Sequence, residues 1–188
     1  MNLVRLITWA LELVFAYCLL AVVGLSVQNV PPGTVSGPSW VDEKWPFSID
    51  QWGTGHAFGC AADQCGHEIH LYLRAKIGFC RCTTGVSNDD EIDRVGDLEF
   101  IGAHYEPLAP GHALTAGLMT GRARLFAVDH PRESPTTVLT IALAHKCDSI
   151  VATVLTKPYV QSELEDQVLE FLRSAAVQQW VEAQTGSE

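Results

Sequence analysis

The feature that most constrains this chain is a run of apolar residues near its N-terminus. Residues 6–27, LITWALELVFAYCLLAVVGLSV, are 22 residues long and contain one charged side chain, Glu12. In a helix such a run extends about 33 Å, which is enough to cross a bilayer core of about 30 Å. The sequence therefore predicts a transmembrane anchor at 6–27, preceded by a short cytoplasmic N-terminus at 1–5.

Two other interpretations of the apolar run stay open. A cleaved signal peptide usually has an apolar run of only about 7–15 residues, but Gly24 and Ser26 would permit a cut after Ser26. A buried helix of a soluble domain is disfavoured, because the run is apolar on all sides and is followed by the Pro31–Gly33 break. The anchor is the interpretation that we carry forward.

The few charges around the run predict its orientation and raise the question of a partner. Arg5 precedes the run and the next cation is Lys44, so the positive-inside rule places the N-terminus in the cytoplasm. The C-terminal domain would then be exported from the inner (plasma) membrane to the periplasm or the extracellular space. Glu12 either reaches the interface or contacts an integral membrane protein partner, and the sequence does not decide between them.

Composition limits what the rest of the chain can bind. Residues 28–40 are rich in proline, glycine and serine and are predicted to be a linker, which leaves 41–188 as a single exported globular domain. The net charge is −10, with 22 acidic and 12 basic residues. This balance disfavours binding to nucleic acid or to anionic lipid through a broad basic patch.

Hydrophobic periodicity predicts the elements of this domain. Residues 67–77 alternate strictly between apolar and polar side chains, which indicates a strand with one buried face. Ser87 with Asp90, and Ser162 with Glu165, match capping boxes at the starts of two helices. Residues 40–59 are predicted to be irregular. The predicted strands are 67–77, 113–119, 122–128, 136–144 and 149–156, and the predicted helices are 87–100 and 162–184.

These elements predict the fold class α+β. We expect an N-terminal transmembrane helix, then one mostly antiparallel sheet domain that ends in a long C-terminal amphipathic helix. On one strand Arg122 and Arg124 share a face, which we interpret as a solvated face paired to carboxylates.

The cysteines are predicted to form two disulfides in an oxidising compartment. Cys60 and Cys65 both precede the 67–77 strand, so each is the nearest partner of the other. Cys147 lies in a turn of the sheet that Cys82 is expected to reach, which predicts a Cys82–Cys147 bond. Cys80 would stay reduced and buried as a small apolar side chain.

In a reducing compartment the same region would be a candidate metal site. Cys60, Cys65, His67 and His70 are ligand types that suit zinc or copper. Their spacing matches no common metal module, and on a strand His67 and His70 face opposite sides.

No local catalytic signature stands in the sequence, and in particular there is no GxSxG elbow. The leading hypothesis is a membrane-anchored accessory, assembly or interaction subunit of a membrane protein complex, non-catalytic and without a cofactor. The alternative is an exported metal- or thiol-handling (redox) protein that uses zinc or copper. A hydrolase of unrecognised type is the third hypothesis.

Overall fold

The computed structural model describes residues 39–78, 81–130, 133–157 and 161–185. All of these residues belong to one compact unit. The predicted transmembrane segment at 6–27, with Glu12, lies outside the described residues, and so does Cys80.

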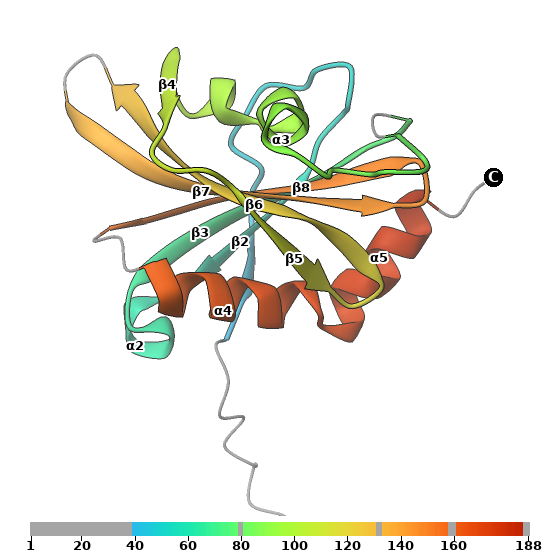
Figure 1. Cartoon of the computed structure of the whole chain (residues 1–188). Helices are drawn as coiled ribbons and strands as arrows, with labels where there is room; N and C mark the ends of the chain where they lie inside the picture. Colours follow the sequence, from blue (N-terminus) through green and yellow to red (C-terminus); the bar gives the residue numbers. More distant parts are fainter. Residues whose placement is uncertain (1–38, 79–80, 131–132, 158–160, 186–188) are drawn as a thin grey trace, which may run out of the picture. The chain divides into compact units, whose positions relative to one another are not determined.

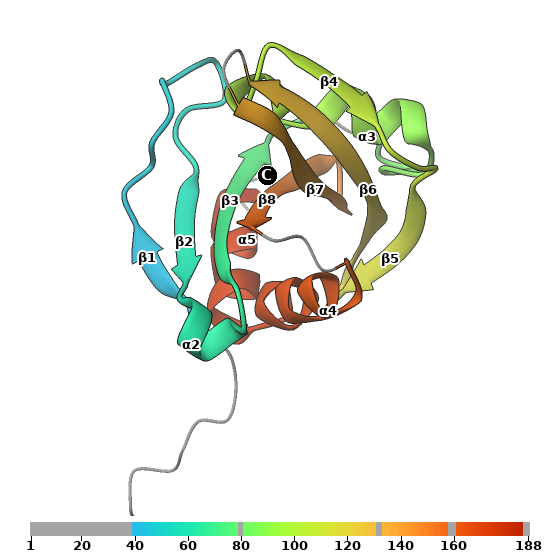
Figure 2. The ribbon, with the colours of Figure 1, turned by 90° about the vertical axis from the view of Figure 1, so that its left-hand side faces the viewer.

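The described chain is built on one eight-stranded sheet whose neighbouring strands are all antiparallel (Figure 1). The strand order is β1-β2-β3-β8-β7-β6-β4, and β5 pairs with β6 next to β4. The sheet curves strongly from β1 to β5 (Figure 2). The strands are β1 (Val41–Glu43), β2 (His56–Cys60), β3 (Glu68–Lys76), β4 (His104–Pro107), β5 (His112–Ala116), β6 (Met119–His130), β7 (Glu133–His145) and β8 (Asp148–Lys157).

Turn residues set the register of two hairpins, β7–β8 and β5–β6. β7 and β8 are joined by two residues, of which Lys146 has a φ of 57°, as a tight hairpin turn requires. The β5–β6 turn lies at Gly117, which has a φ of 62°, and not at Thr120–Gly121, the gap between the predicted strands 113–119 and 122–128. Gly121 is instead an internal residue of β6, where the absence of a side chain lets β7 approach closely.

Helices form a small part of the described residues and are shorter than predicted. They are α2 (Ala62–Cys65), α3 (Asp89–Val95), the 3-10 turn η1 (Leu98–Phe100), α4 (Gln161–Leu172) and α5 (Ala175–Thr185). At the start of α3 the cap is Asn88 and not Ser87, because the Asn88 side chain accepts a hydrogen bond from Glu91 N at 2.9 Å. The predicted helix at 162–184 is broken after Leu172. Ser174 caps the second half by accepting from Val177 N at 3.4 Å.

The two faces of the sheet are covered by different elements. α4 and α5 lie against one face and α3 lies against the other (Figure 1). The larger core, on the α4–α5 face, joins Leu71, Leu73, Ile150 and Val154 of the sheet to Leu164, Val168, Leu172, Val177 and Val181 of the helices. The smaller core packs Ile92 and Val95 of α3 on Ala142 and Val151. The sheet is therefore the middle layer of the described residues.

The predicted fold class, α+β with an N-terminal transmembrane helix and one long C-terminal helix, is wrong. The described chain is mostly an antiparallel sheet with few helices. The long helix is two shorter ones, because the Ser174 cap starts a new helix. Among the described helices, none has the length and apolar character that crossing a membrane requires. The segment expected to be irregular, 40–59, contributes β1 and β2, which pairing with β3 stabilises.

Candidate functional site

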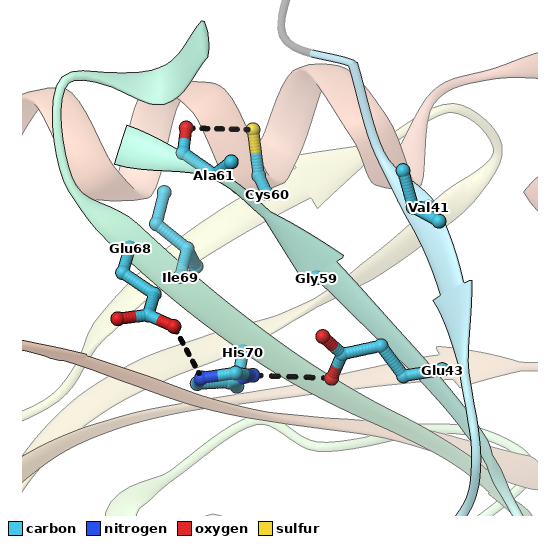
Figure 3. Close-up of a pocket in the computed structure, with 8 residues that line it drawn as sticks. All are labelled: Val41, Glu43, Gly59, Cys60, Ala61, Glu68, Ile69 and His70. Carbon is cyan, nitrogen blue, oxygen red and sulfur yellow. Dashed lines mark hydrogen bonds and ion pairs between the residues drawn. The ribbon is translucent and has the colours of Figure 1, made fainter. Parts of the chain in front are cut away.

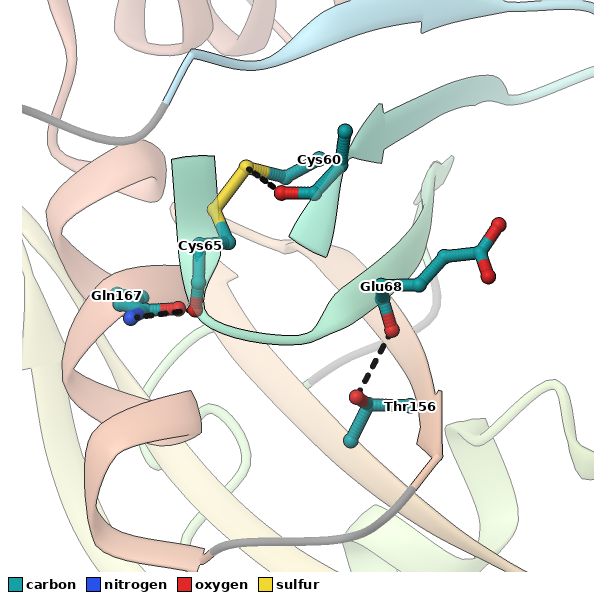
Figure 4. The surroundings of a disulfide bond; sticks show 6 residues. Cys60, Cys65, Glu68, Thr156 and Gln167 are labelled. Carbon is teal, nitrogen blue, oxygen red and sulfur yellow. Dashed lines mark hydrogen bonds between the residues drawn. A yellow bond between two sulfur atoms is a disulfide. The ribbon is translucent and has the colours of Figure 1, made fainter. Parts of the chain in front are cut away.

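Four cysteines are joined in two disulfides, Cys60–Cys65 and Cys82–Cys147, which are the two pairings that the sequence predicted. The Cα atoms are 6.0 Å apart in the first pair and 4.2 Å apart in the second. Cys60–Cys65 closes the α2 turn between β2 and β3 (Figure 4), and Gln167 of α4 donates a hydrogen bond to Cys65 O at 3.2 Å. The disulfide and this hydrogen bond hold the end of the β2–β3 hairpin on α4.

The predicted metal ligands do not come together. The sulfur atoms of Cys60 and Cys65 are bonded to each other, so neither is a thiolate that could bind zinc or copper. His67 lies in the turn before β3, and His70 lies on the face of β3 opposite the larger core. Within residues 39–185, as far as the structure describes them, no three histidine, cysteine or acidic side chains are arranged to hold a metal ion.

A hollow of about 170 Å³ lies over the β1, β2 and β3 strands, at the end that carries α2 (Figure 3). Three residues that face each other in register form its base: Val41 on β1, Gly59 on β2 and His70 on β3. The Glu43 side chain lies over Gly59, since a Cβ atom at this position would lie 2.2 Å from the Glu43 carboxylate. The residues that line the hollow are Val41, Glu43, Gly59, Cys60, Ala61, Glu68, Ile69 and His70.

The imidazole of His70 lies between two carboxylates in this hollow (Figure 3). Its Nδ1 atom is 3.1 Å from Glu43 Oε2, and its Nε2 atom is 3.6 Å from Glu68 Oε1. The hollow is therefore acidic and half-exposed. Its lining residues can attract a cation or exchange a proton, but they include no free hydroxyl or thiol nucleophile, since the Cys60 sulfur is in a disulfide.

A second polar cluster lies where β3 meets the segment that contains α3; Arg74, Lys76 and Asp97 are buried in it, and Asp50 is exposed at its border. Arg74 forms ion pairs with Asp97 and with Asp50, the latter at 2.8 Å, and Lys76 Nζ is 2.8 Å from Asp97 Oδ1. Burial opposes the charge on Asp50, but the hydrogen bonds from Arg74 and from Trp52 N outweigh it and lower the pKa of this carboxyl group. Burial likewise opposes the charge on Arg74, and its two carboxylate partners raise its pKa.

Sequence reasoning missed this cluster. The alternation of β3 correctly placed Arg74 and Lys76 on the polar face, but that face is buried here and not solvated. Asp50 and Asp97 carry no local signal, because their partners lie 24 and 23 residues away along the chain.

Arg122 and Arg124 on β6 also pair with carboxylates of α3. Arg122 Nη2 is 2.6 Å from Asp89 Oδ1, and Arg124 Nη1 is 2.6 Å from Asp93 Oδ2. A hydrogen bond from Gly111 N, together with those from Arg122, lowers the pKa of Asp89. The pairing to carboxylates was predicted, but the two arginines are mostly buried and hold α3 on the sheet.

Two further histidines, His112 and His145, fasten the C-terminal helices to the sheet. His112 Nε2 of β5 is 2.7 Å from Glu165 Oε1 of α4. His145 Nε2 of β7 is 3.1 Å from Glu182 Oε1 of α5. These two histidines therefore contribute to contacts between elements of the fold.

Comparison with known proteins finds no match: no family model matches the chain, and no curated protein and no solved structure matches it.

Proposed function

We propose that the chain is a non-catalytic accessory or interaction subunit of a membrane protein complex, with its sheet domain in an oxidising compartment outside the cytoplasm. The observation that supports the proposal is that several reactive side chains of the domain form disulfides or ion pairs within the fold. The four described cysteines are in disulfides, and Arg74, Arg122 and Arg124 are in ion pairs within the fold. Such a domain offers a partner its shape and its surface charge rather than a reacting group.

The disulfides support the oxidising compartment. Bonds of this kind persist in secreted, periplasmic and extracellular proteins and are rare where thiols are kept reduced. The Cys82–Cys147 bond links residues 65 positions apart, so it staples a loop that contains α3 and four strands. Its function is then structural.

Purification of the full chain in mild detergent tests this proposal. We expect an integral membrane protein to co-purify in stoichiometric amount and to crosslink to a photoreactive amino acid placed at an exposed position of the sheet domain. An unrelated exported protein with the same tag is the control. A strictly monodisperse monomer with no crosslinked partner would contradict the proposal.

The same preparation distinguishes the proposed accessory function from the alternative, a metal- or thiol-handling protein. Elemental analysis and thiol counting on the native chain are expected to find no stoichiometric zinc or copper and no dithiol that cycles reversibly. Either finding would replace the accessory function with the alternative one.

A further inference from the structure

We propose that β1 is a docking edge, to which a partner protein adds an extended segment that carries two adjacent basic residues next to an apolar one. The inference rests on the proposed function and names the surface and the partner chemistry through which the domain would act. The mode of binding is strand addition, in which main-chain hydrogen bonds supply affinity and alternating side chains supply specificity.

The two edges of the sheet differ in how they are protected. At one edge β4 ends in Pro107, which has no N–H to donate, and Arg173 Nη2 donates to Thr115 O of the neighbouring β5 at 2.8 Å, although most residues of both strands are exposed. At the other edge β1 pairs with β2, and no other described strand or helix lies outside it (Figure 2). All three residues of β1 are exposed, and Val41 is 61% exposed. β1 is therefore an edge of the described sheet that can accept another strand.

β1 is also held in place before any partner arrives. Trp40, which precedes it, stacks on Phe171 of α4 with 4.7 Å between the ring centroids. At the other end of β1, Glu43 extends over Gly59 to reach His70. A strand fixed at both ends loses little conformational freedom on binding, which favours association.

Charge selects the partner. Asp42 and Glu43 occupy two of the three positions of β1, and Glu68, which is 72% exposed, lies near Glu43 across the hollow. Opposite charges on facing residues of neighbouring strands stabilise a sheet, and like charges destabilise it. The added segment is then basic opposite Asp42 and Glu43 and apolar opposite Val41. Lys44 follows the strand and excludes a third basic residue at that end.

The same charges argue against two other occupants. A second copy would place Asp42 and Glu43 of each β1 beside their equivalents, in a chain whose net charge is already −10. The chain's own residues 1–38 contain one basic residue, Arg5, and no basic pair. A short acidic edge strand prevents unwanted pairing with neutral and acidic strands, but it does not repel a basic strand.

The test uses the purified full chain in mild detergent and three fluorescein-labelled six-residue peptides. The probe is acetyl-Thr-Val-Lys-Lys-Val-Thr-amide, which is symmetric and so presents the same pattern in either strand direction. One control replaces both lysines by glutamate. The other replaces both valines by proline, which keeps the charge but prevents strand pairing.

We expect saturable binding of the lysine peptide by fluorescence polarisation, weakened about tenfold or more in each control peptide. The double variant Asp42→Lys/Glu43→Lys is expected to lose about the same factor. Glu106→Lys, which reverses one charge at an exposed position of β4 on the opposite edge, is expected to bind as the wild type does. Binding of the lysine peptide should also slow hydrogen exchange at those β1 amides that do not pair with β2, as strand addition at this edge requires.

Several results would overturn the inference. They are equal binding of the proline peptide, equal loss in Glu106→Lys, or no saturable binding at all. Protection in the free monomer of those β1 amides that do not pair with β2 would show that the chain itself, through residues 1–38, holds this edge. If the wild-type chain formed a dimer and Asp42→Lys/Glu43→Lys abolished it, the occupant of β1 would be a second copy of the chain. A co-purifying partner that is retained by this variant would leave the proposed function standing and remove only the docking edge.

Discussion

Arg74 and Asp97 form a two-point ion pair in which the guanidinium is 1% exposed and the carboxylate is 7% exposed. Arg74 Nε donates to Asp97 Oδ2 at 3.0 Å, and Arg74 Nη2 pairs with the second carboxylate oxygen. That second oxygen is also 2.8 Å from Lys76 Nζ. Asp97, placed just after α3, therefore contacts two buried cations of β3, one of which, Arg74, also pairs with Asp50.

Removing this carboxylate is expected to be costly. Asp97→Asn leaves Arg74 and Lys76 buried without their shared counter-charge, and a broken buried ion pair typically costs about 3–5 kcal/mol. We expect a loss of this size in the free energy of unfolding, measured by urea denaturation. Glu99→Gln, an exposed change in the neighbouring η1 turn, is the control and should have little effect. Equal losses in the two variants would contradict the role given to Asp97.

The two disulfides are expected to stabilise the domain unequally. Loop-closure entropy predicts a loss of about 4 kcal/mol when Cys82→Ser/Cys147→Ser opens the 65-residue loop. It predicts about 2 kcal/mol when Cys60→Ser/Cys65→Ser opens the loop of 5 residues. Urea denaturation without reductant measures both. Peptide mapping under non-reducing conditions should recover these two linked pairs, and a Cys65–Cys80 peptide would contradict the assignment.

Acid is expected to weaken the attachment of α3. The Gly111 N–H and Arg122 lower the pKa of Asp89 below its usual value of 3.8, so the folded chain holds this carboxylate charged more readily than the unfolded chain does. The resulting stability is present in full above about pH 4 and is lost as the pH falls through the lowered folded pKa. Asp50 contributes with the same sign.

Asp89→Asn tests this dependence on pH. The variant should be less stable than the wild type at neutral pH and should lose less stability between about pH 4 and pH 2. Asp63→Asn, an exposed change in α2, is the control and should leave the wild-type slope unchanged. Parallel curves for Asp89→Asn and the wild type would show that Asp89 is not responsible.

Two glycines of the sheet are expected to respond differently to the same substitution. A Cβ atom at Gly121 would lie 1.9 Å from Ala142 O, so Gly121→Ala must push β6 and β7 apart and should cost about 1–3 kcal/mol or more. At Gly59 the nearest atom is the end of the flexible Glu43 side chain, so Gly59→Ala should fold with a small loss. Thermal unfolding of both variants measures the difference. A larger loss at Gly59 would contradict the strand packing described above.

Some elements were predictable because their signal is local. The alternation of residues 67–77 identified β3, and the apolar runs on either side of His145–Asp148 identified the β7–β8 hairpin. The two cysteine pairings followed from where neighbouring strands must end, so tethering limited the possible partners. Residues close in sequence carried the information for β3, the β7–β8 hairpin and Cys60–Cys65, and the ends of neighbouring strands carried it for Cys82–Cys147.

Other features depended on contacts between distant residues. β1 and β2 have little strand pattern of their own and exist because β3 pairs with β2 and β2 pairs with β1. The hollow arises where Glu43, Gly59 and His70 meet from three strands.

By itself, the sequence of the described chain determined the polar and apolar faces of its longest strands and which cysteines could reach each other, because both follow from backbone geometry over short distances. Only the tertiary structure decided which polar face is buried and which strands form the edges of the described sheet. Arg74 and Lys76 alternate like any solvated pair, and the carboxylates that permit their burial arrive from segments more than twenty residues away. The energy of these ion pairs depends on contacts that form only in the folded chain, so it cannot be inferred from a local pattern of residues.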